Sequence, residues 1–156
     1  MNDHIITREE CGVCCYCCIF DSSDLTEMPI IPDAMKKELE KRFPDLKFHP
    51  HGACWMFQVE PDEERLYRCP MHSEQGCILG DQKPFDCLIY PFCIMRWDSR
   101  LVISLTSECA ATYNKPLAQM MDVLEQGLAD RIFAEAKADP DLVRDYVDGA
   151  VILKML

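Results

Sequence analysis

The feature that most constrains this chain is a crowd of cysteines near its start, in the segment REECGVCCYCCIF (residues 8–20). Five of the eight positions from Cys11 to Cys18 are cysteine. Adjacent cysteines close a strained ring when they are oxidised to each other, because their side chains do not reach the geometry that a disulfide needs. These thiols therefore either form separate bonds with distant cysteines or bind an inorganic group.

The rest of the composition favours an inorganic group. With 49% hydrophobic residues among 156, the chain can build a core without crosslinks. The first residues, MNDHIITREE, lack the basic patch and apolar segment of a secretory signal, so we expect a cytoplasmic protein. In a reducing compartment, dense cysteine is typical of metal binding or catalysis. The 11 cysteines are also an odd number, so they cannot all pair within one chain.

Charge and hydropathy exclude two classes of partner. The chain carries 27 acidic and 16 basic residues, which gives a net charge of −11. Proteins that bind nucleic acid take most of their affinity from basic side chains that neutralise phosphates, so no nucleic acid is expected. No apolar run approaches the ~18 residues of a membrane-spanning helix, so no membrane span is expected either.

The segments between the cysteines predict a small single domain of the α+β class over residues 1–156. Residues 22–43 predict a turn and then a helix with Pro32 in its first turn, and Pro44 ends that helix. Two short β-hairpins are expected, one over residues 54–69 and one over residues 93–105. The first should turn at Pro61–Glu64 and the second at Asp98–Ser99. Met35, Leu39 and Phe43 form the apolar stripe of the helix.

The segment after Asn114 is predicted to be helical, so a metal-chelating part (roughly residues 8–113) is followed by a helical part (114–156). Its apolar residues recur at helical spacing, and we expect this stripe to dock on the domain's own core, with a partner-binding helix as the alternative. Asp139-Pro140 predicts a further short helix, and the tail AVILKML either adds a strand to the sheet or contacts another subunit. The stripe consists of Leu117, Met121, Leu124, Leu128 and Ile132.

The later cysteines stand singly, often beside glycine and proline. Such neighbours predict irregular loops that curl around a metal centre and aim backbone N–H groups at sulfur. The segments CGVCC, CPMHSEQGC, CILGDQKPFDC, YPF and CAATY follow one another in that order. This order resembles the YkgJ-like cysteine cluster family, which is described as a zinc- or iron-chelating domain with a C-x-x-C-x-x-C-C motif. The resemblance covers roughly residues 8–113 and implies metal chelation.

The chain departs from the family pattern at three positions. Arg8 stands where the first cysteine of the motif is expected, Lys83 replaces an arginine, and Leu88 stands where the family has another arginine. Cys17 or Cys18 would stand in for the ligand that is missing at position 8. The resemblance thus implies a rearranged ligand set, and the candidate metal ligands are Cys11, Cys14, Cys15, Cys69, Cys77, Cys87, Cys109 and Cys18.

Weaker candidates surround this set. Cys17, Cys54 and Cys93 are read as extra ligands, redox-active thiols or buried free thiols. In so acidic a chain, Asp81, Asp86 and Glu108 are expected to be solvated carboxylates. A mixed His/Cys site is open, but each histidine is expected to be an ordinary surface or loop residue. The histidines are His4, His49, His51 and His72.

The spacing of the cysteines bears on the metal. Structural zinc sites usually show two C-x-x-C knuckles, whereas here most candidates arrive singly around one dense group. We therefore expect an iron–sulfur cluster of the [4Fe-4S] type, one or two per chain, with zinc as the alternative. The expected function is electron transfer, or an accessory or catalytic subunit that works with a redox or enzyme partner protein; the alternative is a structural zinc-binding interaction module. No phosphate loop or nucleophile elbow is present, so the sequence does not decide whether the protein is an enzyme.

Overall fold

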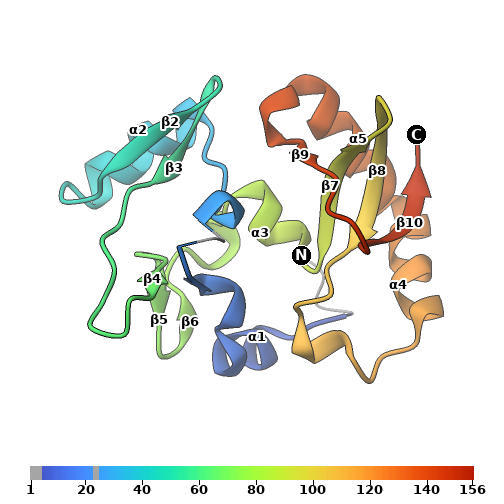
Figure 1. Ribbon diagram of the computed structural model, residues 1–156, viewed down its shortest axis with the longest axis horizontal. Helices are drawn as coiled ribbons and strands as arrows, with labels where there is room; N and C mark the ends of the chain where they lie inside the picture. The colour runs from blue at the N-terminus through green and yellow to red at the C-terminus, as the bar shows by residue number, and fades with distance from the viewer. Residues whose placement is uncertain (1–4, 23–24) are drawn as a thin grey trace.

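A computed structural model describes residues 5–22 and 25–156 (Figure 1). His4 and part of the turn expected before residue 32 lie outside the described residues. The described part confirms an α+β architecture, with helices and several small sheets. None of its helices is long and apolar enough to cross a membrane.

The main sheet has four strands in the order β10–β8–β7–β9. β7 (Phe92–Trp97) and β8 (Arg100–Leu105) form the hairpin that was predicted over residues 93–105. Asp98 and Ser99 both have positive φ angles, 45° and 63°, as the two central residues of a tight hairpin turn require. The second predicted hairpin is therefore confirmed.

The C-terminal tail completes this sheet. β10 (Val151–Met155) pairs antiparallel with β8, and β9 (Arg144–Asp145) pairs parallel with β7. The tail thus adds a strand to the sheet, which was one of the two predicted outcomes, and the part after residue 114 is not wholly helical. The short helix predicted at Asp139-Pro140 is present as the 3-10 helix Pro140–Leu142, with the Asp139 carboxylate accepting a hydrogen bond from its first turn.

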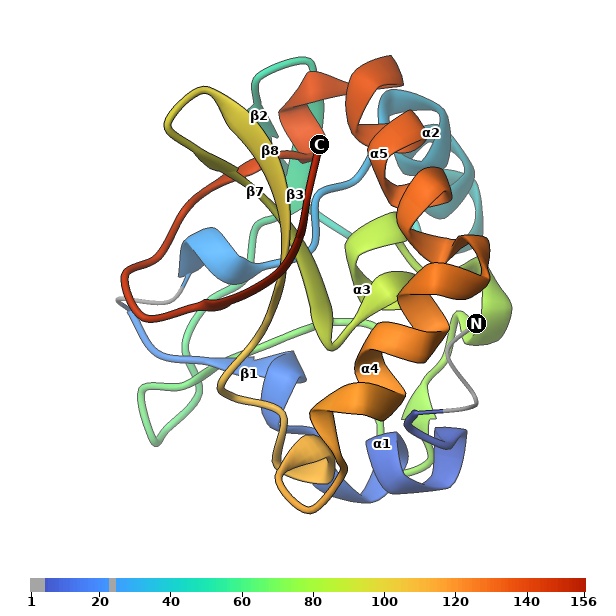
Figure 2. The ribbon, with the colours of Figure 1, turned by 90° about the vertical axis from the view of Figure 1, so that its right-hand side faces the viewer.

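The helical segment after Asn114 runs along the sheet but is interrupted (Figure 2). α4 (Leu117–Val123) and α5 (Ala129–Ala138) are joined by a wide turn, Leu124–Leu128. Gly127 has a φ of 101° in this turn, a left-handed conformation that few residues other than glycine adopt. The periodic apolar pattern gave no sign of this break.

The predicted docking of the helical stripe on the domain's own core is confirmed for Leu124, Leu128 and Ile132, but Met120 is buried there in place of the predicted Met121. Leu124 and Ile132 are buried against strand residues such as Ile94 and Ile103, and Leu128 packs on the same core. Leu117, in contrast, is half exposed. We call this the sheet core; its buried members are Ile5, Ile89, Phe92, Ile94, Ile103, Met120, Leu124, Ala129, Ile132, Phe133 and Ala136.

A second core lies on the other side of the molecule (Figure 1). α2 (Asp33–Arg42) confirms the predicted helix and buries Leu39, with Pro32 as the N-cap residue and not within the first turn. It packs beside a two-stranded sheet of β2 (Phe48–His51) and β3 (Cys54–Phe57). We call this the α2 core; its buried members are Phe20, Met28, Ile31, Leu39, Met56, Phe57, Cys69, Met71 and Leu79.

The predicted hairpin over residues 54–69 is wrong. β3 pairs with β2, while β4 (Tyr67–Arg68) pairs with β1 (Ile19–Phe20). The intervening segment does turn, but as a loop around Asp62, whose carboxylate accepts hydrogen bonds from the backbone N–H groups of Glu64 (2.9 Å) and Leu66 (3.0 Å). The two strands therefore separate and pair with different parts of the chain.

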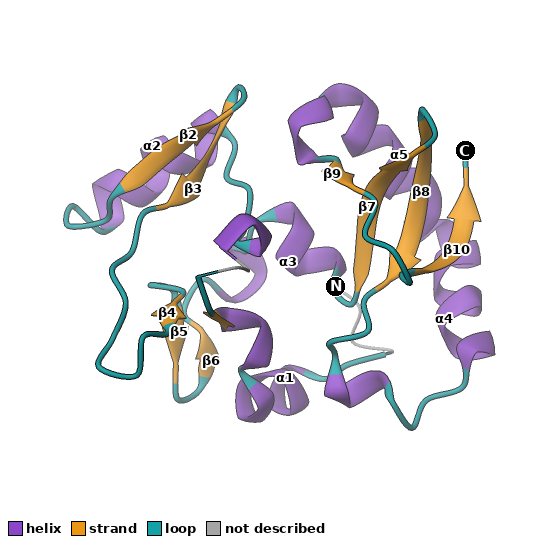
Figure 3. Ribbon diagram, viewed as in Figure 1, coloured by secondary structure: helices purple, strands orange, loops and turns teal. Residues whose placement is uncertain are grey.

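Short elements carry several of the cysteines (Figure 3). α1 (Arg8–Cys14) begins the chain's regular structure, β5 (His72–Ser73) pairs with β6 (Gly76–Cys77), and α3 (Phe85–Ile89) lies between the two cores. The sequence predicted irregular loops here. The structure instead places Cys11, Cys77 and Cys87 within a helix, a strand and a helix.

Candidate metal centre

A cavity of about 1070 Å³ lies between the two cores. Phe57 and Leu79 of the α2 core line it together with Phe92 and Ile94 of the sheet core. Eight cysteines from five separate segments also line it: Cys11, Cys15, Cys17, Cys18, Cys69, Cys77, Cys87 and Cys93. The fold thus gathers into one cavity five of the seven cysteines that match the family pattern, together with Cys18.

Backbone pairing brings the first and middle cysteines together. β1 and β4 pair, and just beyond them the backbone N–H of Cys69 donates to the carbonyl of Cys18 at 2.8 Å. The backbone N–H of His72 in turn donates to the carbonyl of Cys69 at 3.0 Å. These bonds fix the start of the CPMHSEQGC segment against the cysteine run of the N-terminus.

Asp86 fixes the position of α3 and hence of Cys87. Its carboxylate accepts hydrogen bonds from the backbone N–H of Ile30 (3.0 Å) and from Arg144 Nη2 (2.9 Å). Arg144 also donates to the carbonyl of Met28 at 2.8 Å, so one cation ties three segments together beside the cavity. The sequence predicted a solvated carboxylate at Asp86; the structure places it in a partly buried ion pair.

A second, much smaller cavity of about 20 Å³ lies beside the first. Cys15, which separates α1 from the 3-10 helix Tyr16–Cys18, has a φ of 53°, an uncommon conformation for a residue with a Cβ. Its Sγ donates to the carbonyl of Gly12 at 2.7 Å. The small cavity is lined by Cys11, Cys14, Cys15, Cys17 and Cys109.

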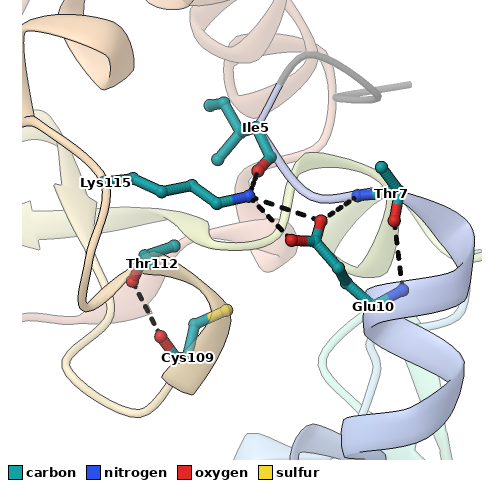
Figure 4. Close-up of polar contacts among 6 residues, drawn as sticks. All are labelled: Ile5, Thr7, Glu10, Cys109, Thr112 and Lys115. Atoms are coloured by element: carbon teal, nitrogen blue, oxygen red, sulfur yellow. Dashed lines mark hydrogen bonds and ion pairs between the residues drawn. The ribbon is translucent and has the colours of Figure 1, made fainter.

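Lys115 links the segment after Cys109 to the start of α1 (Figure 4). Its Nζ lies 3.2 Å from a Glu10 carboxylate oxygen and donates to the carbonyl of Ile5. Glu10 and Thr7 cap the start of α1 reciprocally. Lys115 closely follows the 3-10 helix η4 (Ala110–Thr112), which Cys109 precedes. The cap and the ion pair therefore keep the cysteines of α1 near Cys109.

Burial opposes ionisation of the thiols in the large cavity. It raises the pKa of Cys69 to about 12 and that of Cys93 to about 11, and it raises the pKa of Cys87 strongly, with Asp86 adding to the effect. At Cys17 a hydrogen bond with Cys11 lowers the pKa, but a hydrogen bond with Cys18 and burial outweigh it and raise the pKa to about 12. These thiols are therefore neutral unless a cation displaces their protons.

The thiols influence one another in two groups. After burial and Asp86, Cys69, Cys17 and Cys77 raise the pKa of Cys87. Burial likewise raises the pKa of Cys109, and here the contributing thiols are Cys14 and Cys11. Of these thiols, Cys69, Cys77 and Cys87 line only the large cavity and Cys14 and Cys109 only the small one, whereas Cys11 and Cys17 line both.

Cys54 lies apart from both cavities. It is buried in β3, and its Sγ donates to Asp139 Oδ2 at 3.3 Å. Asp141 accepts a hydrogen bond from the backbone N–H of Ala53. Within residues 5–22 and 25–156, Cys54, Asp139 and Asp141 are the one group of three or more Cys, His, Asp or Glu side chains whose candidate ligand atoms all lie within 4.8 Å of one another. Because each of these side chains forms a hydrogen bond within the fold, we interpret the group as a structural contact that joins the β2–β3 turn to the 3-10 helix Pro140–Leu142.

The described histidines lie in different environments. His49 is exposed, as expected, whereas His51 and His72 line the large cavity. The Nε2 atom of His72 is buried and has no hydrogen-bond partner in the described part of the chain. The sequence left a mixed His/Cys site open, with His72 three residues after Cys69, but favoured an ordinary surface or loop histidine; the burial of Nε2 does not fit that expectation.

Comparisons with protein-family models, with curated proteins and with solved structures returned no match for this chain. The resemblance to the YkgJ-like family therefore stays a prediction. The function has to be inferred from the cavities and the residues that line them.

Proposed function

We propose that this protein binds an iron–sulfur cluster in the large cavity. The supporting observation is that eight cysteines from five segments line a single cavity between two hydrophobic cores. Cys69, Cys77 and Cys87 approach from one group of short elements, and the run from Cys11 to Cys18 approaches from another. Cysteine thiolates are the usual ligands of iron–sulfur clusters.

The spacing of the thiols supports a group of several atoms over a single ion. Four thiolates around one zinc ion lie about 3.8 Å apart, since each Zn–S bond is about 2.3 Å long in a tetrahedral site. No three cysteines of the described chain have Sγ atoms that all lie within 4.8 Å of one another. A cluster binds its thiolates through separate iron atoms and so spreads them more widely.

The size of the cavity supports a role beyond that of a simple electron carrier. Cavities that hold small-molecule ligands measure about 300–1,000 Å³, and this cavity of about 1070 Å³ is slightly larger than that range. A cluster at its cysteine-lined wall would leave space for a substrate. When bound, the cluster would supply electrons or, at an iron with an open position, Lewis acidity. We therefore propose a cluster-dependent accessory or catalytic subunit, supplied with electrons by a redox partner protein.

Anaerobic purification tests this proposal. We expect a brown protein with broad absorbance near ~400 nm and with iron and acid-labile sulfide in similar amounts. The Cys87→Ser variant should lose most of the iron and sulfide, because Cys87 lines the cavity from the anchored helix α3. The matched control, Cys54→Ser, should keep both, because Cys54 lies outside the cavities. Full retention of iron and sulfide in Cys87→Ser would contradict the proposal.

A second candidate function, structural zinc binding, is favoured by the small cavity. Its volume of about 20 Å³ suits one atom-sized guest, since about 10–15 Å³ is enough for a water molecule. To hold a single zinc ion there and link α1 to η4, the side chains of Cys11, Cys14 and Cys109 would have to move closer together, because no three cysteines of the described residues have Sγ atoms within 4.8 Å of one another. Zinc analysis of Cys109→Ser tests this idea: zinc should be lost while iron stays. A wild-type protein that contains no zinc would exclude it.

A further inference from the structure

His72 contains a buried nitrogen that the fold leaves without a partner. Its Nε2 atom makes no hydrogen bond to any described residue. Buried polar atoms in folded proteins are nearly always paired, because an unpaired one loses its bonds to water and gains nothing in return. His72 is also one of the residues that line the large cavity, so a group bound there can supply the missing partner.

The β5–β6 hairpin sets His72 beside two of the candidate cysteines. His72 lies directly opposite Cys77 in the antiparallel pair, so the two side chains project from the same face of the hairpin. Both residues line the large cavity, as does Cys69. The hydrogen bond from the His72 backbone N–H to the Cys69 carbonyl holds the third member of this set in place.

We propose that His72 is a nitrogen ligand of the metal group in the large cavity, next to Cys69 and Cys77. This inference rests on the proposed function and adds to it a mixed His/Cys ligand set. A neutral imidazole binds iron through a ring nitrogen, and replacing a thiolate by imidazole removes one negative charge from the centre. A centre with less negative charge accepts an electron more readily, so its reduction potential is more positive than that of an all-cysteine cluster.

Pulsed electron paramagnetic resonance on protein grown with ¹⁵N-labelled histidine tests the inference directly. In the reduced wild-type protein we expect a strong ¹⁵N coupling to the cluster spin, of the size that direct coordination gives. The coupling should persist in His49→Ala, in which an exposed histidine is removed, and in His51→Ala, in which the other cavity histidine is removed. It should disappear in His72→Ala.

The His72→Cys variant provides a second measurement. It replaces the proposed nitrogen ligand by a thiolate, so that no coordination position of the metal group is left empty. We expect it to keep iron and sulfide, to lose the ¹⁵N coupling, and to have a more negative reduction potential, because a thiolate restores the negative charge. A wild-type protein that contains iron and sulfide but shows no strong ¹⁵N coupling would overturn the inference and leave the proposed function standing. A wild-type protein without iron and sulfide would overturn both.

Discussion

At the scale of single residues, Cys69 and Cys93 show how burial changes the pKa of a thiol in the large cavity. Burial raises their pKa values from 9.0 to about 12 and about 11. A thiol with a raised pKa keeps its proton at neutral pH and gives up that proton only when a metal takes its place. If these residues bind a metal, as we propose, metal binding and proton release are the same event there.

This coupling predicts how metal affinity depends on pH. Because protons compete with the metal for thiols whose pKa is raised, the apparent affinity for ferrous iron or zinc should rise with pH and fall as the solution is acidified. We expect a change of about tenfold per pH unit for each proton displaced. Competition with a chelator of known affinity at several pH values measures this slope. An affinity that does not change with pH would show that the ligands are already ionised.

Gly52 lies in the β2–β3 turn, next to the Asp141 carboxylate, and its substitution should destabilise the fold. Gly52 has a φ of 57°, and an added Cβ would lie 2.5 Å from the Asp141 carboxylate. Gly52→Ala is therefore expected to lower the free energy of unfolding by about 1–2 kcal/mol for the left-handed backbone alone, with the steric clash in addition. Chemical denaturation measures the change.

A double-mutant cycle separates the two contributions to this loss. In an Asp141→Ala background the carboxylate is gone, so Gly52→Ala should cost less there than in the wild type. Equal costs in the two backgrounds would mean that the clash is relieved by a small shift of the Asp141 side chain.

At the scale of secondary-structure elements, hairpins and helices with strong local signals were predictable. Asp98 and Ser99 sit between alternating strands, and the turn they form sets the register of β7 and β8 without help from the rest of the chain. α2 follows from its apolar stripe and flanking prolines in the same way. Elements whose partners are distant were not predictable, since β3 pairs with β2, whose sequence FHPH has little strand character.

α1 was also missed, although its signal was in the sequence. The reciprocal cap of Thr7 and Glu10 is a capping box, a pattern of threonine followed three residues later by glutamate. The dense cysteines that follow predicted an irregular metal-binding loop at this place instead of a helix. The break at Gly127 is different in kind, since an isolated glycine within an apolar helical pattern is compatible with a continuous helix.

The contact between α1 and η4 predicts an effect on thiol reactivity. Hydrogen bonds from the Thr7 backbone N–H and from Lys115 lower the pKa of Glu10, so the carboxylate stays charged and paired with the Lys115 ammonium. In Lys115→Met this pairing is lost, and Cys109, which is buried, should react with iodoacetamide several-fold faster in the metal-free protein. Mass spectrometry of the labelled protein measures the rate.

The control for this experiment is Lys137→Met, which removes an exposed lysine from the last turn of α5, far along the chain from the small cavity. Its Cys109 should react at the wild-type rate. The same rate in Lys115→Met would show that burial by η4 alone protects Cys109.

At the scale of the whole molecule, two hydrophobic cores meet at a cavity that is lined by thiols. Six of the eight cysteines that the sequence predicted as metal ligands line this cavity, namely Cys11, Cys15, Cys18, Cys69, Cys77 and Cys87, and their role as ligands stays a prediction. The sequence did not predict that Cys14 and Cys109 line a separate small cavity, because the division depends on how η4 packs on α1. Spacing along a chain indicates which residues are candidates, whereas their grouping is set by tertiary packing.

A metal group at the junction of the two cores should stabilise both. A ligand that binds only the folded state adds about 2.7 kcal/mol when its free concentration is 100 times its dissociation constant. Removing the metal with a chelator is therefore expected to lower the melting temperature, as measured by circular dichroism. Cys87→Ser should melt near the metal-free value with or without added metal, while Cys54→Ser should still respond to metal.

The large cavity also has a consequence for how the protein is made. Its walls include Cys11 and Arg144, which lie 133 residues apart along the chain (144 − 11). With synthesis at about 5–20 residues per second, Cys11 leaves the ribosome on the order of ten seconds before Arg144 does. During that interval the crowded thiols of the nascent chain are exposed to every metal ion and oxidant around them. A metal group in this cavity, as we propose it, would therefore be bound with its full set of wall residues only after Arg144 has been made.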